Sequence, residues 1–114
     1  MPLVNKTKNQ IIVAHIEEAN SMWSRMRGLL GRTSLPDDAA MYFDMCTSIH
    51  TFFMKFTIDV VFVDKNSRVV KTFAKVKPGR LIWPILTARA VYEFSEGTIA
   101  RTKIEVGDEL HVGH

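Results

Sequence analysis

The densest group of chemically reactive side chains lies between residues 44 and 59. Cys46 and His50 are four residues apart, a spacing that suits two metal ligands or a thiolate–imidazole pair if the segment is helical or turned. A zinc site would need two further ligands, and the nearby aspartates offer only harder oxygen donors. We favour the simpler interpretation, in which Cys46 is a small buried hydrophobic residue and His50 a hydrogen-bonded residue at the start of a strand. The whole group comprises Asp44, Cys46, His50, Thr51, Lys55 and Asp59.

Two carboxylates stand inside segments that are otherwise apolar. Asp59 follows Ile58 in a run of β-branched residues, and Glu93 is flanked by two aromatic residues. A buried carboxylate must be hydrogen-bonded or ion-paired, because an unpaired buried charge costs several kcal/mol. Lys55 or Arg25 is the expected partner of Asp59, and a structural role is favoured for both carboxylates. If the two faced one cleft, they would resemble a carboxylate pair for acid–base chemistry.

A group of basic side chains offers a second kind of chemistry. Arg25, Arg27 and Arg32 could form an anion-binding face with Lys55, although we favour the simpler explanation that they lie on a solvated helix surface. No aromatic residues are interleaved with these arginines, so we do not expect binding to nucleic acid. The glycines fit neither a phosphate-binding loop nor a dinucleotide fingerprint, and no cofactor is expected.

A β-rich framework must position these side chains. The run at 58–64 is apolar on both faces apart from its aspartates, which predicts a central strand covered on both sides. A turn at Lys65-Asn66-Ser67 joins this run to 68–76, and the two read as a hairpin. Short β-branched or aromatic runs predict strands at 10–17, 40–43, 50–54, 58–64, 68–76, 90–94 and 109–112.

Two helices and one long loop complete the expected framework. An apolar stripe at i, i+4, i+7 and i+8 predicts a helix from about residue 20 to Gly31, and a second helix is expected at 98–104. Residues 80–89 read as a loop with an apolar anchor at Trp83. The fold class expected is α+β, mainly antiparallel β, with a partly closed barrel-like sheet and one or two short helices. The stripe comprises Met22, Met26, Leu29 and Leu30.

Length and composition limit the classes of protein to consider. The 114 residues suffice for one domain, and 46% hydrophobic with 24% charged residues excludes a disordered chain or a coiled coil. The net charge of +3 is weak support for an acidic partner, and one cysteine excludes an internal disulfide. No secretory signal or apolar run of membrane-spanning length is present, so the chain as given is expected to be soluble and cytoplasmic.

Several motifs occur in a fixed order along the chain. They are RMRGLLGR at 25–32, LPDDAAMYF at 35–43, SIHTFFMKFTIDVVFVDKNSRVV at 48–70, AVYEFSEGTIA at 90–100 and VGDEL at 106–110. Together they resemble an uncharacterised prokaryotic family, domain of unknown function 192, over about residues 11–112. The resemblance implies a small mixed fold with a β-barrel-like sheet and no established activity. It also implies an association with the bacterial envelope, since many members are exported.

The chain departs from the family pattern at two places. Ala40 stands before Met41, where the family usually has glycine. Many members carry Trp-Met-Lys-Asn, whereas residues 53–56 read Phe-Met-Lys-Phe. The asparagine is missing, and any role that it has in other members cannot be carried over to this chain.

Three functions are compatible with these features. The first is a monomeric binding or accessory module with a polar pocket near residues 49–59, holding a small anionic or sugar-like ligand. The second is a small hydrolytic enzyme that uses Asp59 or Glu93 with His50. The third is a protein-interaction domain without a pocket. The expected binding residues are Arg25, Arg27, His50, Lys55, Asp59 and Glu93.

Overall fold

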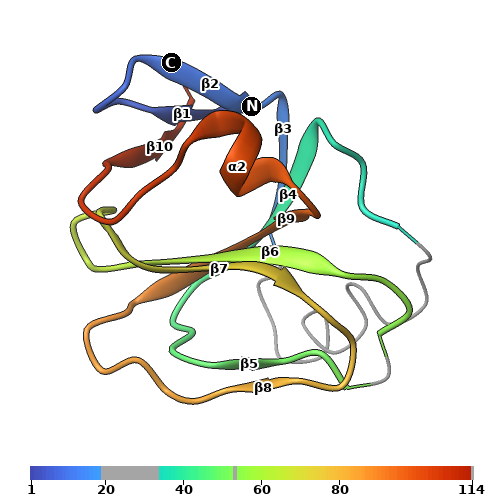
Figure 1. Ribbon diagram of the computed structural model, residues 1–114. Coiled ribbons are helices and arrows are strands. Elements are labelled where there is room, and N and C mark those ends of the chain that lie inside the picture. Colours follow the sequence, from blue (N-terminus) through green and yellow to red (C-terminus); the bar gives the residue numbers. More distant parts are fainter. Residues whose placement is uncertain (19–33, 53, 114) are drawn as a thin grey trace.

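The computed structural model describes residues 1–18, 34–52 and 54–113 (Figure 1). Within these ranges the protein is mostly β, with one short helix, α2 (Thr98–Thr102). The helix predicted from residue 20 to Gly31 lies outside the described residues. The strands are β1 (Leu3–Asn5), β2 (Gln10–Val13), β3 (His15–Glu18), β4 (Ala39–Phe43), β5 (Ile49–His50), β6 (Ile58–Val63), β7 (Val69–Val76), β8 (Leu81–Ile82), β9 (Ala90–Ser95) and β10 (Leu110–Val112).

A five-stranded sheet forms the middle of the molecule. Its order is β3-β4-β9-β6-β7, and every neighbouring pair is antiparallel except β3 and β4, which run parallel. All residues of β6 and β9 are buried, because other layers cover both faces of these central strands. The predicted central strand at 58–64 and its hairpin with 68–76 are therefore confirmed.

Two smaller sheets cover the opposite faces of the middle sheet (Figure 1). The sheet β10-β1-β2 lies on one face together with α2, and their apolar side chains share one core cluster with the middle sheet. The pair β5-β8 lies on the other face, where a second cluster forms around β6 and β9. The first cluster contains Leu3, Val13, Val61, Tyr92, Phe94 and Leu110, and the second contains Met41, Phe43, Val60, Phe62, Val76 and Ile82.

No sheet of the described residues closes into a barrel. Strands β3 and β7 lie at opposite ends of the five-stranded order, so the middle sheet stays open at both edges. The prediction of a partly closed barrel-like sheet is therefore wrong, because the described strands form three layered sheets. In the part of the chain described here, no helix has the length and apolar character needed to cross a membrane.

Candidate functional site

Asp59 lies in β6 and connects that strand to two neighbouring elements. Its carboxylate accepts a hydrogen bond from the backbone N–H of Lys75 (2.9 Å) and another from the backbone N–H of Ile99 (2.8 Å). Lys75 occupies an irregularity in the β6–β7 pairing, with a φ of 56°, and Ile99 lies in the first turn of α2. The carboxylate is fully buried and is satisfied by backbone donors. Lys55, one of its two predicted partners, is exposed and makes no ion pair with it, and the other, Arg25, lies outside the described residues.

Glu93 lies on the opposite face of the same sheet. In the register of β9, Glu93 stands opposite Val60 and Met41, whereas Asp59 stands opposite Phe94. Because successive side chains of a strand point to opposite faces, Asp59 faces the cluster beside α2 and Glu93 faces the other cluster. The structure therefore does not bring the two carboxylates into one cleft.

The environment of Glu93 keeps its carboxyl group neutral over much of the pH range. The side chain is 6% exposed, and burial raises the pKa of Glu93 to about 8. No hydrogen bond or ion pair joins it to another side chain within the described ranges. A protonated carboxylic acid in an apolar layer has a smaller desolvation penalty than a carboxylate, which explains the raised pKa.

The structure describes three of the remaining residues that were candidates for a binding or metal site, Cys46, His50 and Lys55. His50 is exposed in β5, and its ring stacks on Phe52 at 5.1 Å between centroids. The Cys46 thiol donates a hydrogen bond to the carbonyl of Ser48 (3.0 Å), and Lys55 is exposed. Among the described residues, no group of three or more His, Cys, Asp or Glu side chains could hold a metal ion. Arg25 and Arg27 lie outside those residues, and their role in binding stays a prediction.

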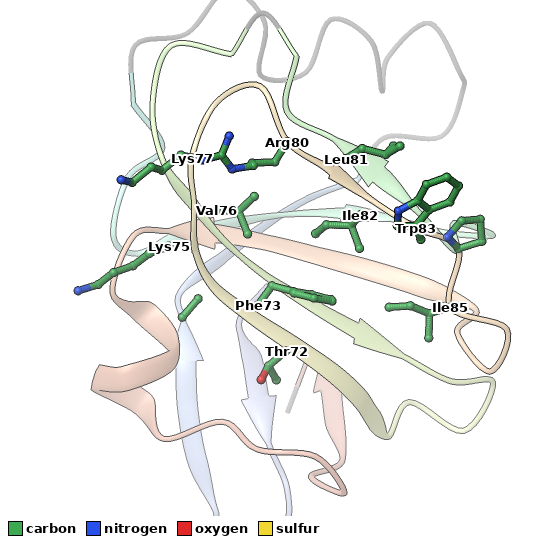
Figure 2. Close-up of a pocket in the computed structure, with 12 residues that line it drawn as sticks. Thr72, Phe73, Lys75, Val76, Lys77, Arg80, Leu81, Ile82, Trp83 and Ile85 are labelled. Carbon is green, nitrogen blue, oxygen red and sulfur yellow. The ribbon is translucent and has the colours of Figure 1, made fainter.

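The structure contains a different candidate site, a groove of about 840 Å³ between β7 and the segment that follows it (Figure 2). Two stretches of chain, 72–77 and 80–85, form its walls, and a turn at Pro78-Gly79 joins them. None of the predicted site residues that the structure describes lines this groove. The lining residues are Thr72, Phe73, Ala74, Lys75, Val76, Lys77, Arg80, Leu81, Ile82, Trp83, Pro84 and Ile85.

The groove combines an apolar interior with basic side chains. Figure 2 shows Phe73, Val76 and Ile82 between the two walls, where they continue the apolar cluster of the middle sheet. Lys75, Lys77 and Arg80 are the charged lining residues among those that the structure describes, and none of these lining residues is acidic. The site therefore matches a ligand that has an apolar body and carries negative charge.

Thr51 fixes the end of the groove near the turn. Its hydroxyl donates to the carbonyl of Lys77 (2.7 Å) and accepts from the backbone N–H of Arg80 (2.8 Å). Its backbone also bonds to Arg80 and to Gly79, and the residue is fully buried. One side chain from the loop after β5 therefore holds both walls of the groove at a fixed separation.

The sequence contains a signal for this groove. Basic and apolar side chains occur together on both sides of the Pro78-Gly79 turn, within residues 75–83, and this composition suits a hairpin with a basic and apolar surface. The prediction that Trp83 is an apolar anchor of the loop at 80–89 is wrong, because the residue is 76% exposed.

Comparisons with known proteins agree with the order of the sequence motifs. The family model DUF192, described as "Uncharacterized ACR, COG1430", matches residues 3–112. The chain belongs to this family. It is 34% identical to UPF0127 protein PH1112 of Pyrococcus horikoshii over 95% of its length and 96% of that protein. It is also 32% identical to a UPF0127 protein of Thermococcus sibiricus, over 95% of the chain and 72% of that protein.

A solved structure supports the fold of this DUF192 member. The chain resembles a protein of unknown function from Novosphingobium aromaticivorans with a TM-score of 0.84 and 24% identity, over 98% of the chain and 84% of that protein. The structure explains the acidic residues of two of the family motifs. Asp59 of the long central motif joins β6 to β7 and α2, and Asp108 of the last motif binds Asn5 and Lys8.

Proposed function

We propose that this DUF192 domain is a binding module whose groove holds a ligand with an apolar body and a negative charge. The observation that carries the proposal is the lining of the groove, which combines Lys75, Lys77 and Arg80 with apolar residues and includes no acidic side chain of the described part of the chain. A ligand carboxylate would gain charge-assisted hydrogen bonds from these groups, while its apolar part would displace water from Phe73 and Ile82.

Several features favour binding over the hydrolytic alternative. Both carboxylate oxygens of Asp59 already accept backbone hydrogen bonds, and Glu93 faces the other side of the sheet. His50 is stacked on Phe52 at the surface. A general acid–base pair needs two groups that reach one substrate, and the two carboxylates do not supply that geometry.

A titration with decanoate tests the proposal, because decanoate has the simplest structure of the proposed ligand class. We expect decanoate to shift the backbone amide NMR signals of residues 72–77 and 80–85. The double variant Lys77→Glu with Arg80→Glu should weaken binding about tenfold, the effect of losing ~1.4 kcal/mol of favourable interaction. Both side chains are exposed, so the fold should persist.

Two controls define the result. Lys65→Glu changes an exposed lysine in the turn between β6 and β7, outside the groove, and should leave decanoate binding unchanged. Decylammonium has the same apolar chain with a positive charge and should bind much more weakly. Equal binding of decylammonium, or amide shifts confined to another surface, would contradict the proposal.

A further inference from the structure

We infer that the natural occupant of the groove is an extended, acidic segment of another protein, which adds as a strand to the outer edge of β7. The inference rests on the proposed function, because it assigns an occupant to the same basic and apolar groove. The sheet order places β7 at one end of the middle sheet, where its second edge has no partner strand among the described residues.

The lining of the groove indicates an extended occupant. Six consecutive residues, 72–77, contact the cavity on the β7 side, and six more, 80–85, contact it on the other side. Successive side chains of a strand point to opposite faces, so a cavity that touches every residue lies along the edge of the strand. A cavity bounded by β7 on one side and by β8 and its flanking residues on the other suits an extended chain, whose backbone can bond to the edge of β7.

The protein already covers the first part of this edge with its own chain. The backbone N–H of Val69 donates to the carbonyl of Asp108, and the N–H of Gly107 donates to the carbonyl of Val69, each at 2.8 Å. Beyond this covered part, the groove begins at Thr72. The loop at 107–108 therefore shows, on the same strand, the kind of backbone pairing that we infer for the occupant.

The charges along the edge select an acidic segment. Lysines on an edge strand oppose pairing with other basic strands, and Lys75 and Lys77 lie along this part of the edge. An acidic segment would instead pair its carboxylates with Lys75, Lys77 and Arg80, so the same side chains favour this partner.

The surface around the groove indicates a protein rather than a free small molecule. Many of the exposed large hydrophobic side chains lie in the segments 45–52 and 81–86, which contain β5 and β8, and two of them also line the groove. A peptide in the groove could extend over this surface and remove it from water, as the apolar centre of an interface does. These residues are Met45, Phe52, Leu81, Trp83 and Leu86.

The test is a selection of random octapeptides on the intact chain, followed by affinity measurements with one selected peptide. We expect enrichment of peptides that alternate apolar residues with aspartate or glutamate. Lys77→Glu with Arg80→Glu should weaken the selected peptide at least tenfold, whereas Lys65→Glu should not. Methylating the backbone nitrogens along one edge of the peptide should abolish binding, whereas methylation along the other edge should not.

Each other outcome has a definite meaning. If decanoate binds in the groove but no acidic peptide is enriched, this inference fails and the proposed function stands. If neither binds there, both fail. Equal affinity of both methylated peptides would overturn the strand-addition geometry. A dimer in sedimentation velocity that Lys77→Glu with Arg80→Glu dissociates would overturn the inference in favour of a second copy of this chain.

Discussion

Asp59 links three elements through one side chain. It stands in β6, and its two oxygens accept backbone hydrogen bonds from β7 and from the start of α2. Asp59→Asn leaves one acceptor oxygen for two buried donors. We expect this change to lower the free energy of unfolding by about 1–3 kcal/mol, the cost of one unsatisfied buried group. Urea denaturation at neutral pH measures the difference.

The matched control is Asp37→Asn, which makes the same chemical change at an exposed position in the turn before β4. It should alter the free energy of unfolding by less than about 0.5 kcal/mol. An Asp59→Asn variant as stable as the control would show that the two backbone donors find other partners.

Glu93 gives the protein a pH-dependent stability. Folding raises the pKa of Glu93 from 4.5 to about 8. Between these two pH values, the folded state holds a proton that the unfolded state has released. The stabilisation of the folded state that comes from this bound proton is therefore complete below about pH 4.5. It decreases as the pH rises and is lost once the pH has passed through about 8. We expect a loss of about 1.4 kcal/mol per pH unit within this window.

Glu93→Gln replaces the acid with a neutral amide of similar shape and should remove this dependence. Denaturation of both proteins between pH 5 and pH 9 gives the difference in slope that isolates Glu93. Glu96→Gln, at an exposed position just after β9, should retain the slope of the unmodified protein. Parallel slopes for Glu93→Gln and the unmodified protein would contradict the assignment.

At the scale of elements, the two walls of the groove depend on a residue outside it. Thr51 holds Lys77 and Arg80 through its hydroxyl but does not line the groove. Thr51→Val keeps the shape of the side chain and removes these bonds. We expect a loss of about 1–3 kcal/mol in the free energy of unfolding and weaker decanoate binding. Calorimetry and the NMR titration measure the two effects.

Thr87→Val is the corresponding control, because Thr87 is exposed in the loop before β9 and does not line the groove. It should leave decanoate affinity and stability close to their starting values. If Thr51→Val is destabilised yet binds decanoate with full affinity, the separation of the walls does not depend on this hydroxyl.

The elements that the sequence predicted well are those with strong local patterns. The buried run of β6, its hairpin with β7, and β9 all follow from apolar residues bounded by turn residues. The predicted strand at 50–54 is wrong in its bounds, because β5 ends at His50. Strands β5 and β8 contain two residues each and pair through Ile49 and Ile82, a contact that no local pattern encodes. The sequence likewise could not place Asp59 and Glu93 on opposite faces, because that depends on register.

At the scale of the whole molecule, a polar cluster joins the start of the chain to its end. Oδ2 of Asp108 accepts hydrogen bonds from Asn5 (2.8 Å), Lys8 (2.9 Å) and the backbone N–H of Glu105 (3.1 Å). Burial alone would raise the pKa of Asp108, but these donors outweigh it and lower the pKa. The cluster therefore stabilises the fold above the usual pKa of an aspartate and weakens as the pH falls below it.

Asp108→Asn should lower the free energy of unfolding at neutral pH by about 1–3 kcal/mol, because the charge on the acceptor is lost. The variant should also lose less stability than the unmodified protein between pH 5 and pH 3. Denaturation at a series of acidic pH values measures both effects. Equal acid sensitivity of the two proteins would show that the cluster does not set the acid limit.

Strand β1 lies between β2 and β10 in its sheet, and the backbone N–H of Gly113 donates to the carbonyl of Pro2 (2.8 Å). Strand β1 therefore cannot complete its pairing until β10, far along the chain, has been synthesised. Until then, Leu3 lacks its partner at Val112, and Asn5 lacks Asp108. One edge of β1 thus stays open to chaperones and proteases while the chain between β1 and β10 is translated.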